Sequence, residues 1–219
     1  MTPGERPGLV IFDCDGVLVD SERLTVEVEA RMLTELGWPL AVPDVVERFM
    51  GGSDASMLAQ ITERLGSEAA EDFDRRSTEE IVAAFEDRLV AIPGVVDLID
   101  ALHDADIPTC VASSGTHRKM NLTLGITGLH DRFKGRIYSA TEVDRGKPAP
   151  DLFLHAAAAM DVAPESCAVI EDSRHGVAGA VAAGMTCFGF AGGLSEPAQL
   201  AEAGAVLFAT MDELRSILL

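Results

Sequence analysis

The sequence alternates short apolar segments with stretches of helical periodicity, and this alternation constrains the fold more than any other feature. The apolar segments span residues 9–12, 109–112, 136–139, 168–170, 185–190 and 205–208. The stretches of helical periodicity between the later segments span residues 94–104, 151–160 and 174–183. Strands that alternate with helices usually form a parallel sheet with helices on both faces. The pattern therefore predicts an α/β fold with a doubly wound parallel sheet.

One long region interrupts the alternation. Residues 21–90 contain amphipathic helix patterns and no convincing strand. The region starts directly after the first strand and its turn, and it ends near a Pro-Gly pair that favours a return to the core. We expect an inserted α-helical cap domain at residues 20–90 and an α/β core domain made of residues 1–19 and 91–219. A cap at this place would overhang the carboxyl ends of the strands, where open α/β sheets bind ligands.

Charge narrows the class of partner. Asp and Glu outnumber Lys and Arg by 36 to 17, which gives a net charge of -19. A nucleic-acid partner requires a basic face, so we expect none. A phosphate site in such an acidic chain must be made locally positive by a metal, a lysine or backbone amides. The chain has no apolar run of membrane-spanning length and no signal-peptide pattern, so we expect a cytoplasmic protein with no membrane partner.

Two aspartates follow the first apolar segment. Asp13 comes directly after it and Asp15 two residues later, so the period of an extended chain points both carboxylates the same way. Mg²⁺ would offset their repulsion, because it takes oxygen ligands from carboxylates, water and phosphate. Asp13 could attack phosphorus, and Asp15 could protonate the leaving oxygen and later activate water. A short acid-glycine segment is also typical of a turn whose aspartates bond their own backbone.

A hydroxyl residue and a lysine follow in two later segments. Ser113 ends the second apolar segment, and the backbone amides of Ser114 and Gly115 precede helix-compatible residues, where an anion could bind. Taken alone, Ser113 is more typical of a helix cap without a ligand. Lys147 lies in Gly-Lys-Pro-Ala-Pro-Asp, whose prolines restrict the backbone around it. Such a lysine could screen the charge of Asp13 and of a transferring phosphoryl group.

The fourth segment repeats the geometry of the first. The apolar run that ends at residue 170 delivers Glu171 and Asp172. Asp172 could also cap the helix that follows. We interpret the glycines of that helix, Gly176, Gly179 and the later Gly184, as packing positions and a helix stop, because their spacing does not fit a dinucleotide fingerprint.

These four segments, in this order, resemble the motifs of the haloacid dehalogenase-like hydrolase superfamily, in its phosphatase and β-phosphoglucomutase-like branch. The first motif is Asp13-Cys14-Asp15-Gly16-Val17-Leu18-Val19-Asp20-Ser21-Glu22, and the resemblance covers nearly the whole chain. It implies a Rossmann-like core, a helical cap and a Mg²⁺-dependent phosphatase that forms an aspartyl phosphate. The implied catalytic residues are Asp13 and Asp15; the metal residues are Asp13, Asp15, Asp172 and Glu171; the phosphate-binding residues are Ser113, Ser114 and Lys147. Glu171 would act through a coordinated water or share the metal with Asp172.

The resemblance also suggests which reaction the chain performs. Dehalogenases of the superfamily lack the second aspartate, so Asp15 favours phosphoryl transfer. The β-phosphoglucomutase-like members carry a histidine about ten residues after that aspartate, where this chain has Thr25. This difference favours a phosphatase acting on a sugar phosphate or phosphorylated sugar acid, with a phosphomutase as the alternative. The segment with Arg48, Gly51 and Gly52 resembles a substrate-specificity loop, in which Arg48 would bind a second anionic group or simply lie on a solvated helix face.

A receiver-type signalling domain is the non-enzymatic alternative. It also combines acids, a phosphorylatable aspartate, a hydroxyl residue and a lysine on a doubly wound sheet. It needs neither the insertion of about seventy residues nor a general acid at Asp15, and both count against it. We expect a monomer or a weak dimer whose partner is a small phosphate monoester.

Overall fold

The computed structural model describes residues 6–49 and 54–219. The chain divides into two compact units. An α/β unit consists of the described residues up to Asp20 together with Val90–Leu219, and a helical unit consists of Ser21–Leu89. The second unit coincides with the region in which the sequence pattern showed no strand.

The described part of the α/β unit contains one parallel sheet of six strands. The strands are β1 (Leu9–Phe12), β2 (Thr109–Ser113), β3 (Ile137–Ser139), β4 (Cys167–Glu171), β5 (Thr186–Phe190) and β6 (Val206–Phe208). Their order is β3-β2-β1-β4-β5-β6, so the order reverses between β1 and β4. This is the doubly wound arrangement, and the predicted α/β class is confirmed.

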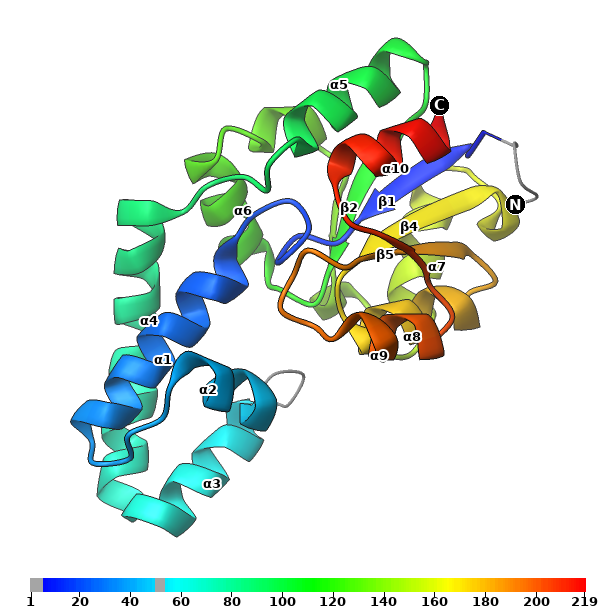
Figure 1. Cartoon of the computed structure of the whole chain (residues 1–219). Helices are drawn as coiled ribbons and strands as arrows, with labels where there is room; N and C mark the ends of the chain where they lie inside the picture. Colours follow the sequence, from blue (N-terminus) through cyan, green and yellow to red (C-terminus); the bar gives the residue numbers. More distant parts are fainter. Residues whose placement is uncertain (1–5, 50–53) are drawn as a thin grey trace. The chain divides into compact units, whose positions relative to one another are not determined.

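Helices cover both faces of this sheet (Figure 1). On one side lie α5 (Val95–Asp104) and α10 (Met211–Leu218), which pack together, and on the other α7 (Asp151–Ala159), α8 (Arg174–Ala182) and α9 (Pro197–Glu202). α6 (His117–Ile126) and three short 3-10 turns, η1 (His130–Phe133), η2 (Ala140–Glu142) and η3 (Pro164–Ser166), complete the connections. Each covering helix buries its apolar residues against the strands, which explains the helical periodicity of the sequence.

The central strand β1 is buried on both faces, as its unbroken apolar sequence predicts. Leu9 and Ile11 belong to a core cluster that includes Phe153 of α7 and Val177 of α8. Phe12 points to the opposite face, where its ring meets that of Phe133 edge to face at 6.0 Å between centroids. The strand is therefore fixed in position by packing from both sides, and so is the loop that follows it.

The described residues of the helical unit form four helices and no strand: α1 (Ser21–Glu35), α2 (Val42–Phe49), α3 (Asp54–Leu65) and α4 (Ser67–Arg88). Arg76 of α4 pairs with Glu35 of α1 at 3.0 Å, and Arg31 of α1 pairs with Glu80 of α4 at 2.5 Å. Exposed ion pairs of this kind contribute only about 0–1 kcal/mol each. Buried side chains, among them Leu33, Phe73 and Phe85, therefore hold these helices together.

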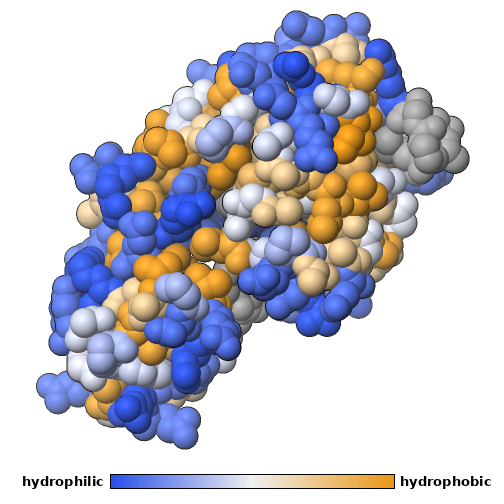
Figure 2. All heavy atoms as spheres, in the orientation of Figure 1, coloured by the Kyte–Doolittle hydropathy of each residue, from blue (hydrophilic) through white to orange (hydrophobic). Residues whose placement is uncertain are grey.

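The surface mixes hydrophilic and hydrophobic residues on the face seen in Figure 2. Large apolar side chains exposed on β6 and α10 include Val206, Leu207 and Ile217. Single exposed apolar residues are normal for a folded protein. Within the two described ranges, no helix has both the length and the apolar character needed to cross a membrane.

Candidate active site

The polar residues predicted from the sequence follow strands that end at the same edge of the sheet. Phe12 at the end of β1 is in register with Val111 of β2 and with Ile170 of β4, so the chain segments after these strands emerge side by side. The Asp13 amide still donates to the carbonyl oxygen of Ile170 at 2.9 Å, which fixes Asp13 directly beside β4. This edge is where doubly wound sheets bind their ligands.

Lys147 joins three of these strand ends. Its Nζ donates to Asp13 Oδ1 at 2.5 Å, to Glu171 Oε1 at 2.6 Å and to the carbonyl oxygen of Ala112 at 3.1 Å. The ammonium also lies over the ring of Phe153, 5.1 Å from the ring centroid. The Lys147 side chain is only 5 % exposed. A long and normally flexible side chain is thus held at one point, between two buried carboxylates.

Burial and neighbouring charges shift the pKa values of Asp13 and Lys147. Burial raises the pKa of Asp13 to about 7, with further increases from Glu171 and Asp15, although the neighbouring Lys147 lowers it. Burial alone would lower the pKa of the Lys147 ammonium, but the Asp13 and Glu171 carboxylates outweigh this effect and raise it. Lys147 therefore carries a positive charge, which is the local cation that an acidic chain needs in order to bind phosphate.

Glu171 is committed to protein partners on both of its oxygens. Oε1 accepts from Lys147, and Oε2 accepts from the Asp172 amide at 3.0 Å, the Ser173 amide at 2.9 Å and the Ser173 hydroxyl at 2.9 Å. A Cβ at Gly176 would lie 1.8 Å from Oε1, so only glycine leaves room for this carboxylate. Our sequence interpretation of Gly176 as a helix packing position missed this role. In this arrangement Glu171 anchors Lys147.

Asp15 has a lysine of its own. Lys119 of α6 donates from Nζ to Asp15 Oδ2 at 2.9 Å. Burial alone would lower the pKa of Lys119, but the Asp15 carboxylate outweighs it and raises this pKa. Lys119 was not predicted from the sequence, because a lysine on a helix that begins after a strand is usually a solvated residue. The one available signal was its place in the first turn of the helix that follows the serine motif.

Residues 113–116, which follow β2, lie at the same edge of the sheet. Ser113 ends β2 with its side chain buried, and its Oγ accepts from the Gly115 amide at 3.1 Å. Ser114 is exposed. Thr116, not a serine, caps α6, since its side chain accepts from the Lys119 amide. The alternative interpretation of Ser113 as the cap of this helix is therefore wrong.

Asp172 lies against the loop that carries the aspartate pair. Its side chain is buried, and a Cβ placed on Gly16 would be 1.9 Å from its Oδ2. Gly16 also has a φ of 78°, which favours glycine. The approach brings the Asp172 carboxylate next to the turn that follows Asp13 and Asp15. Carboxylate oxygens are the donors that Mg²⁺ prefers, so these three aspartates suit this ion chemically.

The carboxylates do not form a complete metal cage. Within residues 6–49 and 54–219, no three His, Cys, Asp or Glu side chains lie close enough to hold one ion together. Mg²⁺ commonly uses only one or two carboxylates and fills its other positions with water and substrate phosphate. The residues present therefore fit a magnesium site of that open kind.

Arg48, one of the predicted specificity residues, belongs to the helical unit. Arg48 is exposed in the last turn of α2, and its guanidinium lies over the Trp38 ring, 5.3 Å from the centroid. Trp38 in turn contacts Phe49 edge to face. Gly51 and Gly52 lie outside the described residues.

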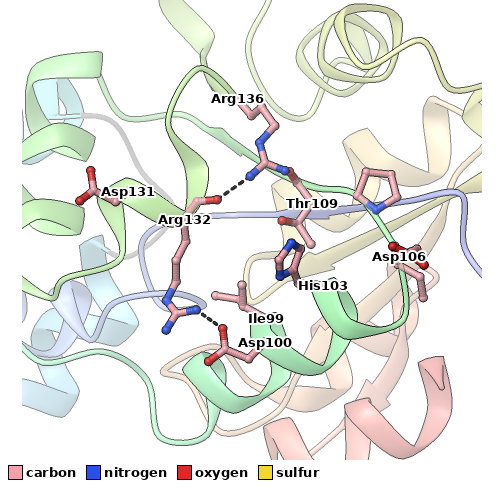
Figure 3. A pocket seen from close by; sticks show the side chains of 10 residues that line it. Ile99, Asp100, His103, Asp106, Thr109, Asp131, Arg132 and Arg136 are labelled. Carbon is pink, nitrogen blue, oxygen red and sulfur yellow. Dashed lines mark hydrogen bonds and ion pairs between the residues drawn. The ribbon is translucent and has the colours of Figure 1, made fainter.

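A pocket of about 500 Å³ lies at the opposite edge of the sheet (Figure 3). It is lined by α5 and by residues at or before the starts of β2 and β3, including Thr109 and Arg136. Its arginines already have partners, because Arg132 pairs with Asp100, and Arg136 donates to the carbonyl oxygens of Arg132 and Thr109. The residues that follow the carboxyl ends of the strands therefore form the better candidate site.

The chain is similar to several known proteins. The 6-phosphogluconate phosphatase of Escherichia coli (strain K12) is 33 % identical over 83 % of this chain and 81 % of its own. A phosphorylated carbohydrates phosphatase of Thermotoga maritima is 32 % identical over 95 % of this chain and 97 % of its own. The crystal structure of a haloacid dehalogenase (HAD) family hydrolase from Deinococcus radiodurans R1, with bound phosphate and sodium, has a TM-score of 0.84. It is 31 % identical and covers 97 % of this chain and 95 % of its own.

Residues 7–184 match the family model of the haloacid dehalogenase-like hydrolases. This range includes all four motif segments and the strands β1 to β4 that carry them. The chain therefore belongs to the haloacid dehalogenase-like hydrolase family.

Proposed function

We propose that this chain is a Mg²⁺-dependent phosphatase that hydrolyses a small phosphorylated metabolite through an aspartyl phosphate on Asp13. One observation carries the proposal: Asp13 follows the central strand in a buried position, and the Lys147 ammonium lies 2.5 Å from its Oδ1. A buried carboxylate paired with a fixed cation can attack an anionic phosphoryl group without prohibitive repulsion.

The relatives support a phosphatase and indicate a substrate class. Two of them are named as phosphatases, one of 6-phosphogluconate and one of phosphorylated carbohydrates. We therefore propose a sugar phosphate or a phosphorylated sugar acid as the substrate. Hydrolysis of such a monoester needs a nucleophile, a proton donor for the leaving oxygen and positive charge around the phosphoryl group.

In the first step, an Asp13 oxygen attacks phosphorus while the bond between phosphorus and the ester oxygen breaks. Asp15 gives a proton to the departing oxygen, so the sugar leaves as an alcohol. Lys147 stays beside Asp13 and offsets the charge that collects on the phosphoryl oxygens, and the Ser113 hydroxyl and Ser114 amide bind those oxygens. Glu171 holds Lys147 in place for this task.

In the second step, water attacks the phosphorus of the aspartyl phosphate. Asp15, now a carboxylate, takes a proton from this water, and the bond between phosphorus and Asp13 breaks. Inorganic phosphate leaves, and Asp13 returns to its starting form. Each turnover thus consumes one water and one monoester and releases one alcohol and one phosphate.

Mg²⁺ would be held by the carboxylates of Asp13 and Asp172, and Asp15 would contribute through its backbone carbonyl oxygen, because its side chain carries the proton. When bound, it supplies positive charge for the phosphoryl oxygens and relieves the repulsion between these aspartates. Both oxygens of Glu171 already have protein partners, so we assign Glu171 to Lys147 and, at most through water, to the metal.

The helical unit Ser21–Leu89 would serve as the cap that selects the substrate, with Arg48 as a candidate for binding a second anionic group. A phosphomutase remains the alternative, and it would return the phosphoryl group to another oxygen of the sugar. Thr25 stands where the mutases of the family carry a histidine, and this favours hydrolysis. A cytoplasmic monomer or weak dimer is our further expectation.

The test is a panel of phosphate monoesters, with and without Mg²⁺. Hexose phosphates, phosphorylated sugar acids, glycolate phosphate and nucleotides are each incubated with the wild type and with Asp13→Asn. We expect Mg²⁺-dependent phosphate release by the wild type and none by a folded Asp13→Asn variant. Isomerisation of a sugar phosphate without phosphate release would show that the chain is a mutase and not a phosphatase. Turnover by Asp13→Asn would refute the assignment of Asp13 as the nucleophile.

A further inference from the structure

Asp13 and Asp15 of the first motif are paired with different lysines. Lys147 contacts Asp13, whereas Lys119 donates to Asp15 Oδ2 at 2.9 Å. The chain has only three lysines, and the third, Lys134, is exposed. Lys119 thus places the second of the three lysine charges at the residue that handles protons in the proposed reaction.

The fold holds Lys119 in this position from several sides. Its amide donates to the side chain of Thr116, which caps α6. The loop before the helix passes close by: an ideal Cβ on Gly115 would lie 3.7 Å from Lys119 Cδ and 3.6 Å from Asp15 Oδ2. The carbonyl oxygen of Gly115 accepts from the Ser139 hydroxyl at 2.7 Å, which ties this loop to the end of β3. Hydrogen bonds therefore fix the backbone from which the Lys119 side chain extends.

Stability alone does not explain this pair. The side chain of Lys119 is 41 % exposed, and that of Asp15 is 16 % exposed. An ion pair with one partner so accessible to water contributes little to folding. Its geometric effect is larger, because an aspartate that is free to rotate would place its proton correctly only part of the time.

We propose that Lys119 is the positioning residue of Asp15, and that it holds this carboxyl group toward the leaving oxygen during phosphoryl transfer. The proposal rests on the proposed function, in which Asp15 is the general acid, and it adds a residue that acts only through Asp15.

Leaving groups of different basicity test this role. The alkoxide of a sugar must be protonated as it leaves, whereas p-nitrophenolate needs almost no proton. A comparison of kcat/KM for a sugar phosphate and for p-nitrophenyl phosphate therefore separates a loss of acid catalysis from a loss of binding or of nucleophilic attack. In Lys119→Met, which keeps the length of the side chain without its charge, kcat/KM for a hexose 6-phosphate should fall at least about tenfold more than for p-nitrophenyl phosphate. The loss should appear in kcat, with KM little changed. Lys119→Arg should recover part of it.

Three controls separate this effect from others. Lys134→Met removes an exposed lysine and should leave both substrates unaffected. In an Asp15→Asn background, Lys119→Met should cause no further selective loss, because the residue it positions is gone. The urea midpoint of unfolding of Lys119→Met should match that of the wild type.

Equal losses on both esters in Lys119→Met would overturn the proposal. So would a loss confined to the KM of phosphorylated sugar acids, since Lys119 would then bind the substrate carboxylate. If Lys119→Met is less stable than expected, a failure of Lys119→Arg to restore the selective loss decides against the proposal. A wild type that releases phosphate from no monoester would instead refute the proposed function itself.

Discussion

Replacement of Lys147 by methionine tests the central electrostatic feature of the site. Lys147 Nζ lies 2.5 Å from Asp13 Oδ1 and 2.6 Å from Glu171 Oε1, and both carboxyl groups are buried. Methionine fills similar space but leaves two buried carboxyl groups without their shared cation. Removing one partner of a buried ion pair usually destabilises a protein by about 3–5 kcal/mol. We expect a loss of this size for Lys147→Met near pH 8 in the absence of metal.

The loss should depend on pH in a defined direction. The pKa of Asp13 is raised to about 7 in the folded protein. A carboxyl group with a raised pKa contributes stability below its unfolded pKa, and this contribution is lost as the pH rises through the folded value. Lys147 lowers the pKa of Asp13, so its removal raises this pKa further. Near pH 5 Asp13 is protonated in both the wild type and Lys147→Met. The part of the destabilisation that comes from an unpaired Asp13 carboxylate therefore disappears at that pH.

Urea unfolding followed by circular dichroism, with a chelator present, measures this effect at both pH values. Lys134→Met is the matched control, since it removes an exposed lysine from the same unit. A free energy of unfolding for Lys147→Met equal to that of the control near pH 8 would refute the reasoning. A loss that grows toward pH 5 would contradict the assigned sign.

Three further predictions concern the surroundings of the site. Gly176→Ala should displace the Glu171 carboxylate, because its Cβ would lie 1.8 Å from Oε1; we expect a destabilisation of about 1–3 kcal/mol in urea unfolding and a large loss of kcat. Gly16→Ala should push Asp172 away from the turn, so phosphate release should require a higher Mg²⁺ concentration than in the wild type, and an unchanged Mg²⁺ requirement would count against Asp172 as a metal ligand. Chelation should abolish phosphate release, and Mg²⁺ should restore it; metal-independent hydrolysis would contradict the proposed cofactor.

Much of the fold could be predicted because its strands are buried on both faces. Buried parallel strands require unbroken apolar sequence, and β1, β2 and β4 show it directly. The edge strand β3 was also visible, although its buried residues are fewer and its expected start differs by one residue. Strand order needed the structure, because the apolar pattern of a strand does not identify its neighbours.

The site was predictable where a residue directly follows a strand. Asp13 and Asp172 belong to this class, since the carboxyl ends of parallel strands meet at one edge of the sheet. Lys119 was not predictable, because 104 positions separate it from Asp15 and only the packing of α6 brings them together. The role of Gly176 was hidden for a similar reason: a glycine in a helix usually indicates packing, and only the coordinates place a carboxylate against it.

Direct identification of the phosphorylated residue tests the central claim. In Asp15→Asn, the group that activates water is absent, so an aspartyl phosphate formed from an aryl phosphate should persist long enough to be trapped. After rapid acid quench, borohydride reduction of the acyl phosphate and proteolysis, mass spectrometry locates the modified residue. We predict modification at Asp13 alone. Modification of another residue, or phosphate release in a single turnover with no modified aspartate, would contradict the account.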